Sequence, residues 1–370
     1  MNKLCIYVTI IIISMLFIVP TIGIISTDKN KIIEIDNRKI AQFPSSTHNF
    51  FSNFTKYLED RLLFKDEITS KLYGPYSEYF KESSISSVFV HGKQNWLFLG
   101  NAENNNFDKH TKNLSVNHIK LNSFIKKLEE LQRAFQTDLI LFVGPDKDSI
   151  YLEYYPIPVS GKNRYFNKIK STIEKKFNII DPTDIFLMQK NNNILYLLDD
   201  SHWNKLGAYI GYQYLMESFK LSPISVSFCV QEHKIGDIAK LAGINSTFSY
   251  SSTNDTFSPI SIDKNITYIS SSYPDKRFEF TPFDTEVIKL RQQSDLLISF
   301  NPTAYYDKNI LIFTDSFGDA FVPFLQATFT RVYWINRYLN NNKSLPLIKK
   351  YLHSNPNFLI YLCVERMIGD

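Results

Sequence analysis

The stretch that decides the fold is residues 310–318, which read ILIFTDSFG. Its first four residues, Ile310–Phe313, are wholly apolar, as expected for a strand buried on both faces of a sheet. A polar turn follows, and the residues up to Phe329 have the apolar pattern of a helix. Ser316 would therefore stand at the carboxyl end of a strand and near a helix N-terminus, which is where open α/β sheets bind their ligands.

Strands and helices are predicted to alternate through most of the chain. Amphipathic or apolar patterns predict helices over residues 118–135, 163–177 and 206–219. Short apolar runs predict strands over residues 139–143, 178–181, 332–335 and 358–364. A hairpin is predicted over 87–99, a surface loop over 101–117, and a β-insertion or long loop over 245–285. This alternation indicates an α/β domain with a mostly parallel sheet flanked by helices.

The N-terminus predicts attachment to a membrane. Lys3 precedes an apolar run, Leu4–Ile25, which is close to the ~20 residues needed to span a bilayer. We interpret residues 1–26 as an uncleaved signal anchor, with a cleaved signal peptide as the alternative. Residues 27–85 are predicted to be a juxtamembrane linker and helical segment, and residues 86–370 the main domain. That domain is expected outside the cytoplasm, periplasmic or extracellular, on a single membrane pass.

Composition and charge argue against several classes of function. The formal net charge is only +4 and the basic residues are scattered, so no nucleic-acid groove is predicted. The cysteines Cys5, Cys229 and Cys363 form no CxxC pair, and the histidines lack metal-ligand spacing, so we expect no metal and no cofactor. Cys229 and Cys363 either pair outside the cytoplasm or remain thiols.

A second segment supplies the partners that a serine nucleophile needs. Residues 200–204 read DSHWN, with Asp200 two residues before His202. A catalytic imidazole needs one nitrogen free for the nucleophile and the other held by an acceptor, which Asp200 can provide. Trp203 could form a wall of the site, and Asn204 could cap the following helix. The alternatives are a solvated Asp and His before a helix, or a metal site.

Ser316 is the candidate nucleophile. The free N–H groups at a helix N-terminus can stabilise an oxyanion, which suits acyl transfer. Asp315 cannot share the direction of the serine side chain, and we assign it a structural role in the turn. The alternative is that Thr314–Ser316 is only a helix-capping cluster. The two segments together, rather than either alone, favour a Ser-His-Asp hydrolase or acyltransferase.

Short motifs along nearly the whole chain resemble one family. They resemble the SGNH-hydrolase-like O-acetyltransferases of bacterial cell-surface polysaccharides, including the alginate O-acetylation proteins AlgJ and AlgX and the related DHHW proteins. The matching segments, in the family's order, are Asn37-Arg38 with Phe43-Pro44, Glu59-Asp60-Arg61, Gly92-Lys93 with Trp96-Leu97-Phe98, Pro145-Asp146-Lys147 with Ile150-Tyr151 and Pro156, Asp200–Asn204 with Gly207-Ala208, Gly236–Ala239, Asp315-Ser316-Phe317 and Glu365-Arg366.

The resemblance implies a fold and an activity. It implies an SGNH-like fold with permuted motif order, in which Asp200 (orienting acid) and His202 (base) precede Ser316 (nucleophile). It also implies supporting roles for Lys147 and Tyr151. The implied reaction is transfer of an acetyl group to a polysaccharide hydroxyl through an acetyl-serine. An integral-membrane acyltransferase would supply the acetyl groups.

Some departures from the family pattern and two alternative functions remain open. Thr314 stands where the family has Gly or Arg, which bears on the oxyanion geometry, and Ser201 departs from a strict DHHW motif. A polysaccharide O-acetyl esterase would use the same three residues. A non-catalytic glycan-binding subunit of an export complex would not need them.

Overall fold

The computed structural model describes residues 18, 21–27, 32–33, 38–44, 50–61, 87–159, 164–231, 235–242, 256–259, 266–336, 341–352 and 354–369. These residues fall into two compact units. One contains those up to residue 61 and the other those from residue 87 onward. The predicted boundary at residue 85 lies outside the described ranges.

The first unit contains a short helix and a two-stranded sheet. Helix α2 (Phe50–Glu59) lies within residues 27–85, the predicted juxtamembrane linker and helical segment. Strands β1 (Ile32–Ile33) and β2 (Arg38–Lys39) pair antiparallel. Of the predicted anchor, only residues 18 and 21–26 are described, and the rest lies outside the described residues. Within the described part of the chain, no helix has the length and apolarity that a membrane crossing requires.

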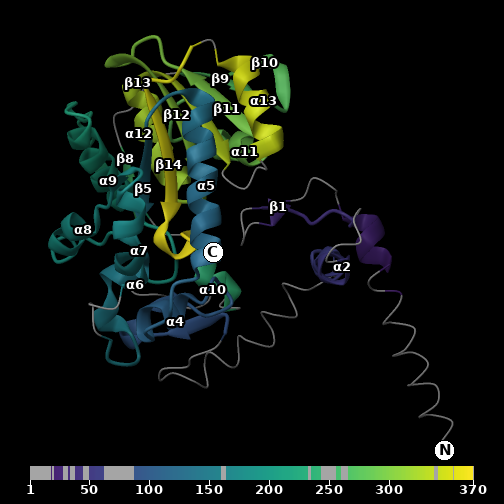
Figure 1. Ribbon diagram of the computed structural model, residues 1–370, viewed down its shortest axis with the longest axis vertical. Coiled ribbons are helices and arrows are strands. Elements are labelled where there is room, and N and C mark those ends of the chain that lie inside the picture. Colours follow the sequence, from purple (N-terminus) through teal and green to yellow (C-terminus); the bar gives the residue numbers. More distant parts are fainter. Residues whose placement is uncertain are drawn as a thin grey trace, which may run out of the picture. The chain divides into compact units, whose positions relative to one another are not determined.

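The second unit is built on an eight-stranded mixed sheet (Figure 1). Parallel pairing joins five neighbouring strands, β13, β12, β14, β5 and β6. The other three extend the sheet by antiparallel pairing. The prediction of a mostly parallel sheet therefore holds only for the half that carries Ser316. Across the sheet the order is β10 (Tyr273–Phe280), β9 (Ile266–Ser270), β11 (Leu296–Phe300), β13 (Phe329–Asn336), β12 (Tyr306–Thr314), β14 (Phe358–Val364), β5 (Leu139–Gly144) and β6 (Asn178–Ile180).

The antiparallel strands β9, β10 and β11 are the part of the sheet for which the prediction of parallel pairing was wrong. Only Ser271 and Ser272 separate β9 from β10, and so short a connection permits only a hairpin, because a parallel pair needs a long crossover. Part of the region 245–285 thus belongs to the main sheet rather than to an insertion. Strand β8 (Thr256–Pro259) of that region pairs with β7 (Phe228–Gln231). The sequence pattern of residues 245–285 did not identify the sheet to which these strands belong.

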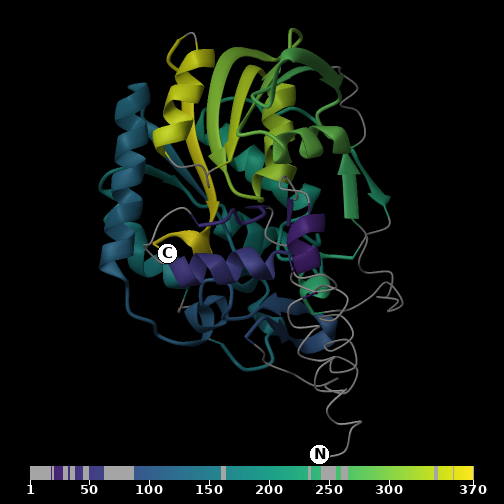
Figure 2. The same ribbon diagram turned by 90° about the vertical axis from the view of Figure 1, so that its right-hand side faces the viewer.

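Helices cover both faces of the sheet, and the side-chain alternation along β12 separates them (Figures 1 and 2). Leu311 and Phe313 join a core with the helices α5 (His118–Phe135), α7 (Tyr165–Glu174) and α13 (Asn341–Tyr351). Ile310 and Ile312 join a core on the opposite face with α8 (Thr183–Gln189), α9 (Lys205–Ser218), α11 (Thr285–Gln292) and α12 (Gly318–Thr328). Successive residues of a strand point to opposite faces, so one apolar run supplies both cores.

Short elements lie beyond the carboxyl ends of the parallel strands. The predicted hairpin is confirmed as β3 (Phe89–His91) and β4 (Leu97–Leu99), with η1 (Lys93–Asn95) between them. The predicted loop 101–117 is partly wrong, because it contains α4 (Asn106–Thr111), whose Phe107 and His110 are buried. The remaining elements are α6 (Lys147–Ile150), η2 (Leu152–Tyr154), α10 (Asp237–Leu241) and η4 (Glu365–Met367).

Candidate active site

Ser316 lies in a tight turn between β12 and α12. The Asp315 carboxylate accepts the Phe317 N–H at 3.0 Å and, across the sheet, the Val364 N–H at 2.9 Å. Asp315 is only 2% exposed and braces the turn, in the structural position expected for it. A Cβ atom on Gly318 would lie 2.2 Å from the Thr314 hydroxyl oxygen, so the close approach here requires a glycine.

His202 lies in the loop before α9, where Asp200 holds it. One carboxylate oxygen of Asp200, Oδ1, accepts the His202 backbone N–H at 2.9 Å and lies 2.8 Å from its Nδ1. Asn204 caps α9 by accepting the Gly207 N–H at 2.9 Å, as predicted for that helix start. The loop therefore fixes both the position and the tautomer of the imidazole, because Nδ1–H has an acceptor.

The fold brings His202 to Ser316. The Nε2 atom of His202 lies 2.7 Å from the Ser316 hydroxyl oxygen, and the two residues are 114 positions apart in the sequence. The side chains of His202 and Asp200 remain 28% and 21% exposed, so a solute can reach them. Serine hydroxyl, imidazole and carboxylate thus form a hydrogen-bonded chain that suits nucleophilic acyl chemistry.

The charges around His202 favour its protonated form. Burial opposes that form, but the Asp200 hydrogen bond and the charges of Asp237 and Asp200 outweigh it and raise the pKa of His202 to about 9. Burial also disfavours the charged Asp200. The hydrogen bonds and charge of His202 overcome this and hold the pKa of Asp200 far below its usual range. Only neutral His202 can accept the serine proton, so its basic form increases toward alkaline pH.

Asp237 is a residue of the site for which no role was predicted from the sequence. Its carboxylate oxygen Oδ2 lies 3.4 Å from Nδ1 of His202, on the same side as Asp200. Its segment, Gly236–Ala239, is one of the motifs of the resemblance, which was the only available signal. Burial and the neighbouring Asp200 raise the pKa of Asp237.

The supporting residues predicted for the site lie behind the reacting atoms. Trp203 is 3% exposed, and its indole N–H donates to the Phe317 carbonyl at 3.0 Å, which joins the two loops. Lys147 is buried and donates to the carbonyls of Leu197, Leu198 and Asp200 at 2.8–2.9 Å. The Tyr151 hydroxyl accepts the Leu195 N–H at 3.0 Å, so Tyr151 supports the loop at a distance from the reacting atoms.

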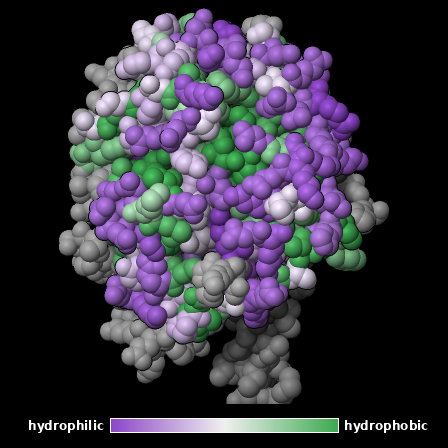
Figure 3. Space-filling view, turned by 60° about the vertical axis from the view of Figure 1, so that its left-hand side comes forward, coloured by the Kyte–Doolittle hydropathy of each residue, from purple (hydrophilic) through white to green (hydrophobic). Residues whose placement is uncertain are grey.

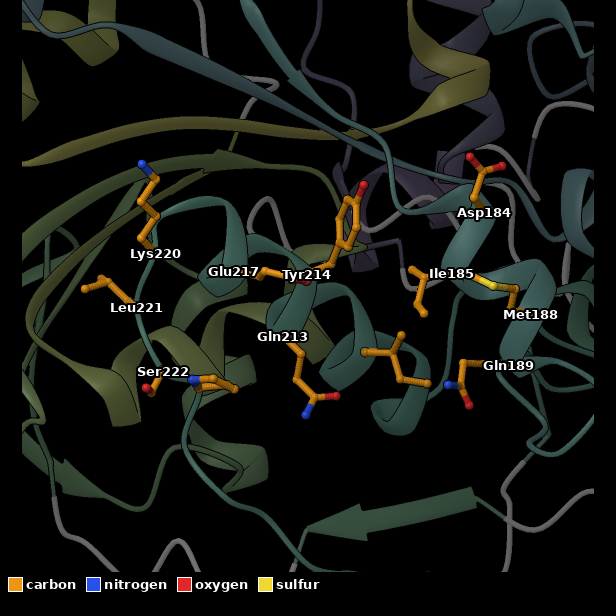
Figure 4. Close-up of a pocket in the computed structure, with 12 residues that line it drawn as sticks. Asp184, Ile185, Met188, Gln189, Gln213, Tyr214, Glu217, Lys220, Leu221 and Ser222 are labelled. Carbon is orange, nitrogen blue, oxygen red and sulfur yellow. The ribbon is translucent and has the colours of Figure 1, made fainter.

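A separate pocket of about 670 Å³ contains none of the predicted site residues (Figure 4). It is lined by α8, by α9 and by the segment after α9, with Met188, Tyr214 and Lys220 among its residues. On the side of the molecule where α8 and α9 lie, hydrophobic patches are interspersed with hydrophilic ones (Figure 3). Met188 is 65% exposed and Tyr214 38% exposed there.

Two groups within the described residues have enough acidic and histidine atoms close together to hold a cation, and we assign a metal to neither. They are His110 with Asp146 and Glu365, and His202 with Asp200 and Asp237. In the first, Asp146 accepts from Arg366 and Glu365 from Arg164, so cationic side chains already neutralise the carboxylates. In the second, Nδ1 of His202 is engaged by Asp200. Cys229 and Cys363 are not joined in a disulfide.

Comparison with known proteins finds one matching family model. Residues 89–266 match the family model described as SGNH hydrolase-like domain, acetyltransferase AlgX. The described residues of this match lie in the second unit, and because of this similarity we refer to that unit as the AlgX-type domain. The match confirms the family resemblance of the motifs. It includes Asp200, His202 and Asp237 and ends before Ser316. No curated protein sequence matches the chain.

Solved structures share the fold of the AlgX-type domain. A DHHW family protein from Eubacterium siraeum is 16% identical, with a TM-score of 0.58 over 78% of this chain and 94% of that chain. PatB1 from Bacillus cereus, solved with a sulfonyl adduct, is 13% identical, with a TM-score of 0.54 over 78% of this chain and 97% of that chain. At these identities the likeness establishes the fold alone.

Proposed function

We propose that this protein is an O-acetyltransferase that modifies a cell-surface or exported polysaccharide through an acetyl-Ser316 intermediate. The observation that carries the proposal is the position of His202, 2.7 Å from the Ser316 hydroxyl and 2.8 Å from Asp200. The AlgX-type domain provides independent support for acetyl transfer. The proposed roles are nucleophile for Ser316, base for His202 and orienting acid for Asp200.

In the first half-reaction, Ser316 takes the acetyl group. Its hydroxyl oxygen attacks the acetyl carbonyl carbon of the donor while Nε2 of His202 accepts the hydroxyl proton. The tetrahedral intermediate collapses when the bond to the donor's leaving oxygen breaks and His202 returns the proton to that oxygen. Asp200 stabilises the imidazolium between the two proton transfers.

In the second half-reaction, a sugar hydroxyl takes the place of the donor. Its oxygen attacks the carbonyl carbon of acetyl-Ser316 while His202 accepts its proton. The bond to Ser316 then breaks, and His202 gives the proton back to the serine oxygen. The site returns to its starting state, and the acetyl group is on the glycan.

The negative charge that develops on the acetyl oxygen needs donors. Among the described residues, no hydrogen bond engages the Ser316 backbone N–H, which stands two residues before α12 begins. We assign it the role of one oxyanion donor. The positive end of the helix dipole adds to its effect.

The proposal includes a location and a partner. Residues 1–26 would hold the protein in the cell membrane, with the AlgX-type domain periplasmic or extracellular, because the run Leu4–Ile25 has a bilayer-spanning length. An integral-membrane acyltransferase would deliver the acetyl groups to this side, as the family resemblance implies. A tagged full-length chain should then cofractionate with membranes, and its AlgX-type domain should be accessible to protease from the outer side.

The test uses purified full-length protein with a chromogenic acetyl ester and detection of the acyl-enzyme by intact mass. Wild type should turn the ester over and carry an acetyl group, and an aryl sulfonyl fluoride should label Ser316. Ser316→Ala and His202→Ala should lose both properties. Ser272→Ala, which removes an exposed hydroxyl that donates to the Gln293 carbonyl, is the matched control.

The same experiment separates the alternatives. Acetate release with no acetylated glycan, when oligosaccharide acceptors are added, would identify an esterase instead. A folded wild type with no turnover, no adduct and no sulfonyl labelling would favour the non-catalytic glycan-binding subunit.

A further inference from the structure

Hydrogen bonds join the start of helix α10 to the loop that contains Asp200 and His202. The Gly236 N–H donates to the Asp199 carboxylate at 2.9 Å, and the Asp237 N–H donates to Asp200 Oδ2 at 3.2 Å. A Cβ atom on Gly236 would lie 2.3 Å from the Asp199 carbonyl oxygen, so this approach requires a glycine. The helix start is therefore held within hydrogen-bond distance of the active-site loop.

The Asp237 side chain uses this placement to contact two consecutive residues of the loop. Its Oδ1 accepts the Ser201 backbone N–H at 2.7 Å, and its Oδ2 accepts the Ser201 hydroxyl at 2.5 Å. The same Oδ2 lies 3.4 Å from Nδ1 of His202. The carboxylate is 18% exposed, so it is only partly screened by water.

The described charged groups that face His202 come from several elements. Asp200 is in the same loop, Asp237 begins α10, and Arg366 of η4 opposes protonation of the imidazole by its charge. Lys147 of α6 acts on His202 indirectly, since its charge favours the ionised form of Asp200. On the Nδ1 side of His202, both charged groups are carboxylates, and the uncharged Ser201 hydroxyl oxygen also lies 3.4 Å from Nδ1.

We propose that Asp237 is a positioning residue for His202: it fixes Ser201 and, with Asp200, stabilises the imidazolium that forms when Ser316 loses its proton. The catalytic consequence rests on the proposed function. The effect on His202 itself does not, because it is a property of the folded protein without substrate. Asp237 touches neither the nucleophile nor an acyl group in this arrangement, so it acts through His202.

This role predicts how the base behaves. Two carboxylates at Nδ1 make His202 a stronger base, which favours proton transfer from serine, but they leave less of it neutral at pH 7. Removal of one carboxylate should lower the pKa of His202 and move the rising limb of the pH–rate profile to lower pH. The rate above that limb should fall by up to roughly tenfold for each unit by which the pKa of His202 falls, because the imidazolium loses that much stabilisation.

The experiment is an NMR titration of the His202 ring in the full-length chain carrying Ser316→Ala, which excludes turnover. Asp237→Asn is compared with Ser201→Ala. The asparagine keeps the size of the side chain and an acceptor for the Ser201 N–H, whereas Ser201→Ala keeps the carboxylate. We expect the His202 midpoint to fall in Asp237→Asn and to stay at the wild-type value in Ser201→Ala.

Each outcome decides a separate question. An unchanged midpoint in Asp237→Asn overturns the inference, and so does an equal fall in both variants, which would make Asp237 only a clamp for Ser201. Should Asp237→Asn fail to fold, Asp237→Ser supplies the same comparison. In the enzyme that retains Ser316, Asp237→Glu keeps a carboxylate and should have the pH–rate profile of wild type. A shifted midpoint without acetyl transfer in any variant contradicts the proposed function and leaves the inference intact.

Discussion

The part of the chain that the structure describes contains two groups of the same residue types, one histidine and two carboxylates, and they have different surroundings. The site group is His202, Asp200 and Asp237, and the buried group is His110, Asp146 and Glu365. Side chains of the site group are 18–28% exposed, whereas those of the buried group are at most 4% exposed. In each group, neighbouring carboxylates raise the pKa of the histidine against the effect of burial.

The difference lies in what faces each histidine. In the site group, Nε2 of His202 meets the Ser316 hydroxyl. In the buried group, Nε2 of His110 lies 3.9 Å from Asp146, which also accepts from Arg366, and Arg164 pairs with Glu365. Neutralising arginines and complete burial give a structural network, while partial exposure and a nucleophile give a group that can do chemistry. Residue types alone do not separate the two.

Substitution of each histidine by glutamine should give the largest difference between the two groups, with His202 affecting activity and His110 affecting stability. Above about pH 9, where the stabilising contribution of protonated His202 is lost, His202→Gln should reduce ester turnover by roughly 10⁴-fold, because the base is lost, with little change in unfolding. His110→Gln should leave turnover nearly intact but lower the free energy of unfolding by about 1–3 kcal/mol, since a buried partner of Asp146 is altered. Ester kinetics and urea denaturation measure the two effects. Equal activity losses would contradict the distinction between the groups.

The buried group should be the more sensitive to loss of one ionic partner. Arg366 is 8% exposed and Asp146 fully buried, so Arg366→Met leaves a carboxylate without its cation and should cost about 3–5 kcal/mol of unfolding free energy. Arg366→Lys, which keeps the charge, is the matched control and should cost less. Chemical denaturation measures both. A loss below 1 kcal/mol in Arg366→Met would show that the network is not a structural unit.

The site group should make stability and activity vary in opposite directions with pH. The pKa of His202 is raised in the folded state, from 6.5 to about 9. Its stabilising contribution is therefore complete below about pH 6.5 and is lost as the pH rises through about 9. Turnover should increase over the same window, because neutral His202 is the base. Thermal unfolding and kcat/KM between pH 6.5 and 9 test this, and His202→Gln should flatten that part of the stability profile.

The smallest predicted effect concerns the cap that follows His202. Asn204→Ala removes the acceptor of the Gly207 N–H at the start of α9 and should cost about 1 kcal/mol of unfolding free energy. Asn204→Asp retains that acceptor but loses the amide N–H that donates to the Ile194 carbonyl. It should therefore fall between wild type and Asn204→Ala in thermal unfolding. Loss of turnover without loss of stability would instead place Asn204 among the groups that orient His202.

Much of the fold could be predicted because short apolar runs carry their own signal. The runs around Ile310, Leu139 and Phe358 are buried strands in the structure, and the predicted helix His118–Phe135 has the observed bounds. The strand Leu296–Phe300 and the hairpin β9–β10 were not predicted as parts of the main sheet. Strand β11 pairs with β13, and the hairpin joins the sheet through pairing of β9 with β11, which local periodicity does not report.

The sequence by itself determined the α/β class, the candidates Asp200, His202 and Ser316, and the family resemblance, because each depends on local pattern or motif order. Only the tertiary structure decided that His202 and Ser316 meet, that Asp237 adds a second carboxylate at Nδ1, and that His110 belongs to a neutralised network. Those outcomes are set by distances between residues far apart in the chain and by burial. Both arise from packing of the whole sheet and its helices.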